Sequence, residues 1–243
     1  MSTTADPAEI ARYNSLAATW WQPDGPMWPL HKLNDLRGPY VVNQICTQLV
    51  IERDRPKPLS GLAVLDIGCG AGLLAEALAA QGASVLGVDP AKRNIEIARA
   101  HALNQGLDIE YRVGDVGLLK PSEHFDAVLN MEVVEHVAHL PSFIERCCAH
   151  TRPGGLHFIA TINRSLASWL TAIVGAEHVL GWLPKGTHQW RKFVKPNEAQ
   201  TLLEQHHHQI VARTGVSINP LTRHYRLTPF LGVNYMLTAR RGS

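Results

Sequence analysis

The residues with the clearest capacity for chemistry are three alternating glycines that follow a short apolar run. Gly68, Gly70 and Gly72 come directly after the run 64–67 and before a segment, 75–80, that is rich in good helix formers. This succession predicts the first strand, turn and helix of an α/β domain. Glycine lets the backbone approach a ligand closely, and the free N–H groups at a helix start favour a polar or anionic group. The turn is therefore predicted to form the floor of a cofactor site.

An acidic residue stands about 20 positions beyond these glycines, at the spacing at which an acid binds ribose hydroxyls. Asp89 ends a second predicted strand, 84–88, and this placement indicates a cofactor that contains a nucleoside. Leu73 occupies the position where a dinucleotide fingerprint has its third glycine, which disfavours NAD. An NAD-dependent oxidoreductase is the weaker enzymatic alternative, and an ordinary tight turn in an α/β domain is the structural one.

More acidic side chains follow the next two predicted strands. Asp115 can accept a hydrogen bond from an exocyclic amine such as that of adenine, although a turn aspartate is nearly as common there. The strand 125–131 leads into Glu132, Glu135 and His136. Because open α/β sheets bind ligands beyond the carboxyl ends of their strands, we expect this cluster to face the same crevice as the glycine turn.

These three side chains could hold a hard cation. Two carboxylates and an imidazole within five residues can converge on Mg²⁺ if they lie on one helical turn, where positions three and four apart share a face. The alternative is that Glu132, Glu135 and His136 merely cap a helix.

Composition narrows the class of protein. The chain has 243 residues, of which 45% are hydrophobic and 18% charged, as in an ordinary globular domain. Its net charge of +2 gives no reason to expect nucleic acid as a partner. The four cysteines have neither a disulfide framework nor a zinc spacing, and we find no secretory signal or apolar run long enough for a membrane span. We therefore expect reduced thiols and a cytoplasmic location.

The chain is predicted to divide into a helical cap, 1–59, and an α/β domain, 60–243. Seven strands are expected in the second part: 64–67, 84–88, 109–113, 125–131, 156–161, 209–217 and 233–239. The run His206-His207-His208 invites a metal interpretation, but without cysteines or spaced acids around it we expect a solvated helix end. Trp20 and Trp21 are expected mainly to fill the core.

A long connection follows the fifth predicted strand. Aromatic and aliphatic residues in the insert, about 165–190, are flanked by lysines and arginines, a pattern typical of an amphipathic segment that lies in a membrane interface. The alternatives are that the insert roofs the substrate pocket or forms a dimer contact.

Several motifs together resemble a known family. The segments 66–72, 114–115 and 152–155, with Asp89, resemble the class I S-adenosylmethionine-dependent methyltransferases. More narrowly, the chain is similar to the ubiquinone-biosynthesis O-methyltransferases, on the motifs 20–21, 29–34, 36–37, 131–136, 161–164, 174–177, 184–188 and 233–236. The resemblance covers nearly the whole chain. Two departures from the family pattern are Asp35, where proline is frequent, and the segment 221–229, which has no close match.

The resemblance implies a Rossmann-like sheet of seven strands, the seventh antiparallel, and S-adenosylmethionine as cofactor. The family's cofactor contacts fall on Arg37, Gly68, Asp89 and Met131, to which the residues themselves add Gly70 and Asp115. The implied substrates are two polyprenylated catechol-type compounds, a 2-polyprenyl-6-hydroxyphenol and 3-demethylubiquinol. Such substrates imply peripheral attachment to the inner membrane surface and a possible quinone-biosynthesis complex as partner.

Methyl transfer to a phenol requires positioning and deprotonation. A phenolic hydroxyl has an unperturbed pKa near 10, so a neighbouring base would accelerate the reaction by about 10² to 10⁴. His136 is the first candidate for this base, with Glu132 or Glu135 orienting it or binding a divalent cation. The competing hypotheses are a class I methyltransferase for another small phenol and a scaffold without catalytic activity in quinone biosynthesis.

Overall fold

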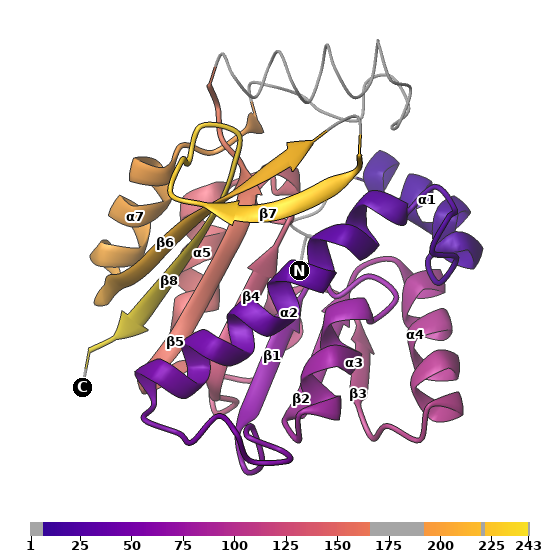
Figure 1. The fold of residues 1–243 in the computed structure, drawn as a ribbon, viewed down its shortest axis with the longest axis horizontal. Helices are drawn as coiled ribbons and strands as arrows, with labels where there is room; N and C mark the ends of the chain where they lie inside the picture. Colours follow the sequence, from indigo (N-terminus) through magenta and orange to yellow (C-terminus); the bar gives the residue numbers. More distant parts are fainter. Residues whose placement is uncertain (1–6, 166–191, 220–221, 243) are drawn as a thin grey trace.

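One eight-stranded sheet forms the centre of the protein. The computed structural model describes residues 7–165, 192–219 and 222–242. Five parallel strands are β1 (Ala63–Ile67), β2 (Ser84–Asp89), β3 (Glu110–Val113), β4 (Phe125–Met131) and β5 (Thr151–Ile162). The others are β6 (His208–Asn219), β7 (His224–Thr228) and β8 (Asn234–Arg241), in the spatial order β3-β2-β1-β4-β5-β8-β6-β7 (Figure 1).

The parallel part of the sheet agrees with the sequence prediction, and so does the antiparallel final strand. β8 pairs antiparallel with β5 and with β6, so it joins the five parallel strands to the β6–β7 edge. The prediction of seven strands is wrong by one, because the sheet contains the additional strand β7. This strand lies within the segment 221–229, which has no close match in the family pattern. β7 is a short edge strand in which only Tyr225 is buried, and its polar–apolar alternation spans just five residues, too few to distinguish a strand from a loop by sequence.

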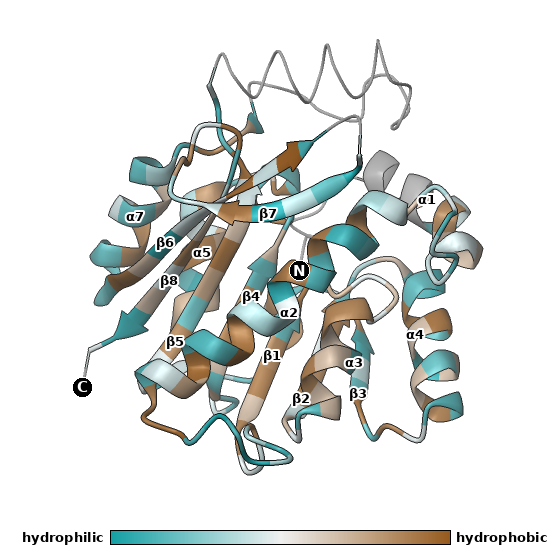
Figure 2. Ribbon diagram, viewed as in Figure 1, coloured by the Kyte–Doolittle hydropathy of each residue, from teal (hydrophilic) through white to brown (hydrophobic). Residues whose placement is uncertain are grey.

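Helices cover both faces of the sheet. They are α1 (Pro7–Leu16), α2 (Trp28–Gln48), α3 (Leu73–Ala80), α4 (Lys92–Asn104), α5 (Leu140–Ala149) and α7 (Pro196–Gln205). Three short 3-10 turns add Ala17–Thr19 (η1), Val116–Leu118 (η2) and Val134–His136 (η3). Apolar residues of α2, α3 and α4 share a core with one face, whereas α5 and α7 share one with the other. Hydrophobic and hydrophilic residues alternate along α2 and α4, as in amphipathic helices on a sheet (Figure 2).

The N-terminal segment is helical, as predicted, and α2 belongs to the main core. Tyr40, Val41 and Ile45 of α2 are buried in the same cluster as residues of β1 and β4. Burial of this face holds α2 across the sheet and fixes the position of its buried Arg37 relative to the strand ends.

Two sequence predictions about other segments have different outcomes. The histidine run is not a solvated helix end throughout: α7 ends at Gln205, and His208 is the first residue of β6 and fully buried. The insert predicted to lie on a membrane falls, from residue 166 to 191, outside the described residues. Within the described part of the chain, no helix combines the length and the apolar character needed to cross a membrane.

Candidate functional site

A cavity of about 270 Å³ opens at the carboxyl ends of the parallel strands. Its walls include every site residue predicted from the sequence: Arg37, Gly68, Gly70, Asp89, Asp115, Met131, Glu132, Glu135 and His136. These residues come from α2 and from the ends of β1, β2, β3 and β4, the strand ends that face one crevice in this topology. The structure therefore brings the predicted residues together, while their individual roles stay predictions.

The glycine turn has no space for side chains of its own at Gly68 and Gly70. Gly68 and Gly70 have φ angles of +72° and +56°, in the left-handed region that favours glycine. A Cβ atom on Gly68 would lie 2.4 Å from the Val133 side chain, and one on Gly70 would lie 2.3 Å from the Trp20 ring. Glycine at these positions lets Val133 and Trp20, two residues of the cavity wall, pack directly on the backbone of the turn.

Asp89 is held by the turn that it faces. Its Oδ2 atom accepts a hydrogen bond from the N–H of Gly70 at 3.0 Å, and Oδ1 accepts from the N–H of Ala91 at 2.8 Å and from Nδ2 of Asn94 at 3.3 Å. Burial raises the pKa of Asp89 to about 6, against these hydrogen bonds, which lower it. A carboxylate offers about four acceptor positions, so one remains for a ribose hydroxyl.

Asp66 is a cavity residue to which sequence reasoning assigned no role. It lies on β1, is 2% exposed, and its Oδ2 atom has no hydrogen-bond partner among the described residues. Burial, and then the charge of Asp89, raise the pKa of Asp66 to about 7. An acid within an otherwise apolar buried strand was the signal available in the sequence, because charged side chains are rarely buried without a partner.

Arg37 and Glu132 form an ion pair in the wall of the cavity. Nη2 of Arg37 donates to Oε1 of Glu132, and the arginine side chain is 1% exposed. The Nε and Nη1 atoms of Arg37 are buried without hydrogen-bond partners among the described residues. Glu132 has a φ angle of +58°, a sparsely populated conformation for a residue other than glycine. Arg37 can therefore offer its unused donors to a carboxylate in the cavity.

Glu135 lies next to this pair on η3. Its Oε2 atom accepts a hydrogen bond from Oγ1 of Thr161 at 2.8 Å, and the residue is 5% exposed. Burial, and then the charge of Glu132, raise the pKa of Glu135 to about 7, whereas His136 lowers it. A carboxyl group with such a pKa can exchange a proton near neutral pH.

The three polar residues do not meet on one helical turn as predicted. Glu132 precedes η3 and turns toward Arg37, whereas Glu135 turns toward Thr161. The described residues contain one group of three metal-ligating side chains whose donor atoms all lie within 4.8 Å of one another, and it lies elsewhere. The left-handed backbone at Glu132 breaks the helical spacing on which the prediction of convergence rested.

Trp21, for which the sequence predicts mainly a packing role, holds the N-terminal segment over the glycine turn. Nε1 of Trp21 donates to the carbonyl of Ala71 at 3.1 Å. The indole stacks on the ring of His101, with centroids 3.5 Å apart, and Nδ1 of His101 lies 2.9 Å from the Glu76 carboxylate. These contacts hold Trp20 and its neighbours beside the cavity.

Comparison with known proteins gives consistent results. A family profile described as a methyltransferase domain matches residues 43–212. A ubiquinone biosynthesis O-methyltransferase of Sinorhizobium fredii is 48% identical over 240 residues, 98% of this chain and 97% of that protein. One of Methylobacterium nodulans is 46% identical over 246 residues, 99% of each chain. The crystal structure of magnesium protoporphyrin IX methyltransferase from Synechocystis with bound S-adenosylhomocysteine is similar in fold, with a TM-score of 0.68, 22% identity, and coverage of 98% of this chain and 100% of that one.

Proposed function

The chain belongs to the ubiquinone biosynthesis O-methyltransferases, and we propose which compounds it methylates and which residues carry the reaction. It is an S-adenosylmethionine-dependent O-methyltransferase of ubiquinone biosynthesis. The proposed acceptors are polyprenylated catechols, the early 2-polyprenyl-6-hydroxyphenol and the late 3-demethylubiquinol. The observation that carries the assignment of residues is the cavity where the glycine turn, Asp89 and the Arg37–Glu132 pair meet.

The cavity offers a separate partner for each part of the cofactor. Gly68 and Gly70 line the cavity and are proposed to face the methionine end, whose carboxylate the free Nε and Nη1 atoms of Arg37 suit. The unpartnered Oδ2 of Asp66 suits the ammonium group of that end. Asp89 is proposed to accept from the ribose.

The remaining lining residues complete this proposal. The Asp115 carboxylate accepts a hydrogen bond from the N–H of Gly117 at 2.9 Å, which holds it in place in the cavity wall. We propose that it also accepts a hydrogen bond from the adenine amine. Met131 ends β4 beside the polar cluster and is proposed to pack against the cofactor. When bound, S-adenosylmethionine supplies a methyl group activated by a sulfonium charge.

The protein's own chemical task is to remove the phenolic proton. We propose that His136 takes the proton from the substrate hydroxyl, since an imidazole titrates nearer neutral pH than the phenol. Glu135 lies next to His136 on η3, and although burial raises the pKa of Glu135 to about 7, its ionised carboxylate favours the protonated imidazole that results. The other wall residues hold the hydroxyl in line with the methyl group, which is where most of the acceleration arises.

Turnover of single variants tests this assignment. His136→Ala should lower kcat for methyl transfer to a catechol by about 10² to 10⁴, because the base is lost. Binding of S-adenosylhomocysteine should stay unchanged, which separates loss of the base from loss of the fold. Full activity in this variant would refute His136 as the base, and total absence of methyl transfer by the wild type would instead favour a scaffold.

A divalent cation is a further prediction of the sequence that the comparisons do not support. As arranged here, Glu132 is committed to Arg37 and Glu135 to Thr161, so the cluster does not fit a cation without releasing Arg37. Turnover after chelation, with and without added Mg²⁺, decides whether Glu132, Glu135 and His136 bind one during catalysis.

We also propose that the enzyme works at the cytoplasmic face of the inner membrane, since a polyprenyl tail stays in the bilayer. The support for this is the aromatic and basic composition of the insert 165–190. Liposome flotation of the wild type against a variant lacking 166–183 tests it, and unchanged lipid binding would exclude the insert as the anchor. A quinone-biosynthesis complex is the proposed partner, testable by co-purification from detergent extracts.

The substrates themselves are best identified in cells. Mass spectrometry of quinone intermediates after deletion of the gene should reveal accumulation of the 3-demethyl compound. Accumulation of a different phenol would identify another acceptor for the same cavity.

A further inference from the structure

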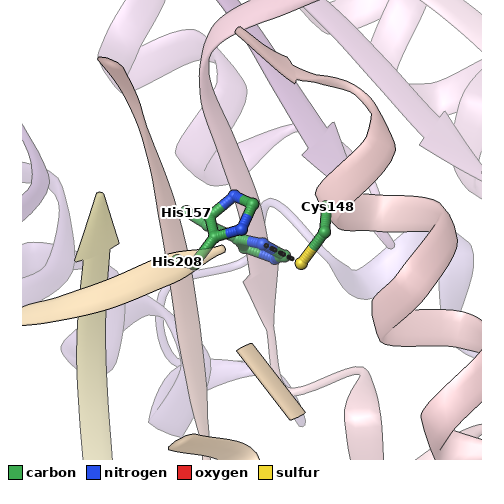
Figure 3. Close-up of side chains that lie close together, drawn as sticks. All are labelled: Cys148, His157 and His208. Carbon is green, nitrogen blue, oxygen red and sulfur yellow. Dashed lines mark hydrogen bonds between the residues drawn. The ribbon is translucent and has the colours of Figure 1, made fainter. Parts of the chain in front are cut away.

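Three side chains that no sequence motif connects meet between α5, β5 and β6. Cys148 stands near the end of α5, His157 lies on β5, and His208 begins β6. All are buried, with exposures of 3%, 0% and 0%. Their donor atoms all lie within 4.8 Å of one another, and this is the one such group in the described part of the chain. We refer to these residues as the Cys148 cluster (Figure 3).

The distance between thiol and imidazole in the Cys148 cluster matches that of two ligands around a tetrahedral metal. Sγ of Cys148 lies 3.5 Å from Nδ1 of His157. A metal with bonds of about 2.3 Å to sulfur and 2.0–2.1 Å to nitrogen separates two such ligands by about 3.6 Å. The rings of His157 and His208 lie 5.7 Å apart and cross at 76°, so they approach the shared space from different directions.

One nitrogen of His208 is ready to bind a metal. Its Nδ1 atom lies 2.7 Å from the carbonyl oxygen of His206, which can only accept, so Nδ1 carries the proton. Nε2 is therefore an unprotonated acceptor, and it is buried without a hydrogen-bond partner among the described residues. A buried polar atom without a partner points to a missing ligand.

His157 also has an outer partner that can orient it. Its Nε2 atom lies 2.6 Å from the side-chain amide of Asn130, whose oxygen and nitrogen exchange places by rotation. With the amide oxygen toward Nε2–H, the lone pair of His157 is on Nδ1, the atom that faces Cys148. Such an outer hydrogen bond is the usual way in which a protein fixes a metal-binding imidazole.

We propose that Cys148, His157 and His208 bind one Zn²⁺ ion, through Sγ, Nδ1 and Nε2 respectively. Thiolate and imidazole ligands favour Zn²⁺, whereas the hard cations Mg²⁺ and Ca²⁺ favour oxygen ligands. Binding displaces the thiol proton to solvent and leaves both histidines neutral. The ion would tie α5 and β5 to β6, and so fasten the antiparallel edge of the sheet to its parallel part.

The Cys148 cluster comes nearest to the protein surface at His208. A surface cavity beside the Cys148 cluster is lined by His207, His208, Glu204 and Arg241, among others. The Arg241 guanidinium donates a hydrogen bond to the carbonyl of Thr151, which holds the positive charge of Arg241 at the wall of this surface cavity.

Co²⁺ is the probe that tests the proposal, since it replaces Zn²⁺ and reports thiolate ligation by its near-ultraviolet absorption. The full-length protein, reduced and stripped of metal, is titrated with Co²⁺ in excess Mg²⁺, which occupies any oxygen-rich site. We expect one equivalent of Co²⁺ to give the thiolate band, and Zn²⁺ to abolish it.

Variants assign the band to the Cys148 cluster. Cys148→Ala should remove the band, and His208→Asn should weaken Co²⁺ binding by at least about 100-fold, more than the 10-fold to 100-fold effect of an outer partner. Cys147→Ala is the matched control, because this neighbouring cysteine is equally buried but its thiol faces Asn130, and it should keep the band. A wild type without the band, or a band that persists in Cys148→Ala, would overturn the proposal.

X-ray absorption of the wild-type protein loaded with Zn²⁺ answers the question even if the variants fail to fold. The expected first shell has one sulfur at about 2.3 Å and nitrogen or oxygen ligands at about 2.0–2.1 Å. A shell without sulfur would overturn the proposal. Neither measurement involves methyl transfer, so the outcome is independent of the proposed acceptors.

Discussion

The cofactor cavity and the Cys148 cluster both gather buried polar side chains, but they arise from the chain in different ways. The cavity is built where strands end, by residues that follow those strands in short runs. The Cys148 cluster combines the end of a helix, a position inside β5 and the start of β6, which are 60 residues apart at their extremes. The first arrangement follows from parallel topology, whereas the second depends on how individual residues pair across the sheet.

The two regions also differ in how their polar atoms are satisfied. In the cavity, Asp89 accepts three hydrogen bonds from the protein and keeps one position free. In the Cys148 cluster, Nε2 of His208 has none among the described residues. Asp66 resembles His208 in this respect, although it lies in the cavity. An unsatisfied buried atom that also lies in a cavity or among metal-ligating side chains thus marks a candidate ligand position independently of any sequence motif.

The strongest test of the comparison adds a methyl group to the glycine turn. Gly70→Ala should weaken binding of S-adenosylhomocysteine by more than about 100-fold, because the new Cβ would meet the Trp20 ring and the φ angle is strained for alanine. Isothermal titration calorimetry measures the loss. Gly106→Ala is the control, since its φ of +66° is similar but its Cβ would meet nothing within 4 Å. Equal losses in both variants would show that backbone strain alone is responsible.

The ion pair in the cavity wall should have the next largest effect. Arg37→Met leaves the Glu132 carboxylate without its partner, which should lower the free energy of unfolding by about 2 kcal/mol. The double variant Arg37→Met/Glu132→Gln should recover part of this stability, because no charge is then left unpaired. Chemical denaturation of the single and double variants gives the coupling. Both the single and the double variant should bind S-adenosylhomocysteine weakly if Arg37 binds the carboxylate of this ligand.

A smaller effect should appear in the pH dependence of stability. The pKa of Asp66 is raised to about 7, above its usual value near 4, so the folded ligand-free protein holds a proton that the unfolded chain has released. Between these values stability should fall as pH rises, by up to about 1.4 kcal/mol per pH unit from this residue. Asp66→Asn should flatten that slope in thermal melts at pH 4.5 to 7. An unchanged slope would assign the dependence to Glu135 or Asp89.

The smallest expected effect belongs to the metal-free Cys148 cluster. His208→Asn keeps a side-chain donor for the His206 carbonyl and removes the unpartnered Nε2, so the free energy of unfolding without metal should change by less than about 1 kcal/mol. Urea denaturation in a chelator measures it. Added Zn²⁺ should then raise the melting temperature of the wild type and leave that of the variant unchanged. A large loss in the chelator would mean that His208 acts through packing.

Much of the fold and of the cavity was predictable because the relevant signals are local. Short stretches of sequence predict the strand, glycine turn and helix at 64–80. The acid after the second strand is likewise identified by its spacing from the glycines. Parallel topology then directs the ends of β1, β2, β3 and β4 to one crevice, which is why the predicted site residues line one cavity. The edge strand β7 was not predicted because it is only five residues long and mostly exposed.

By itself, then, the sequence determined the methyltransferase-like core, its glycine turn and the set of residues at its carboxyl end. Only the tertiary structure decided which partners those residues take: Glu132 turns to Arg37, which is 95 residues away, Glu135 turns to Thr161, and Asp66 keeps an unpaired oxygen. The tertiary structure also brings Cys148, His157 and His208 close together, which no sequence motif predicted. The physical reason is that long-range pairing and burial depend on strand register and helix packing, which no short stretch of residues contains.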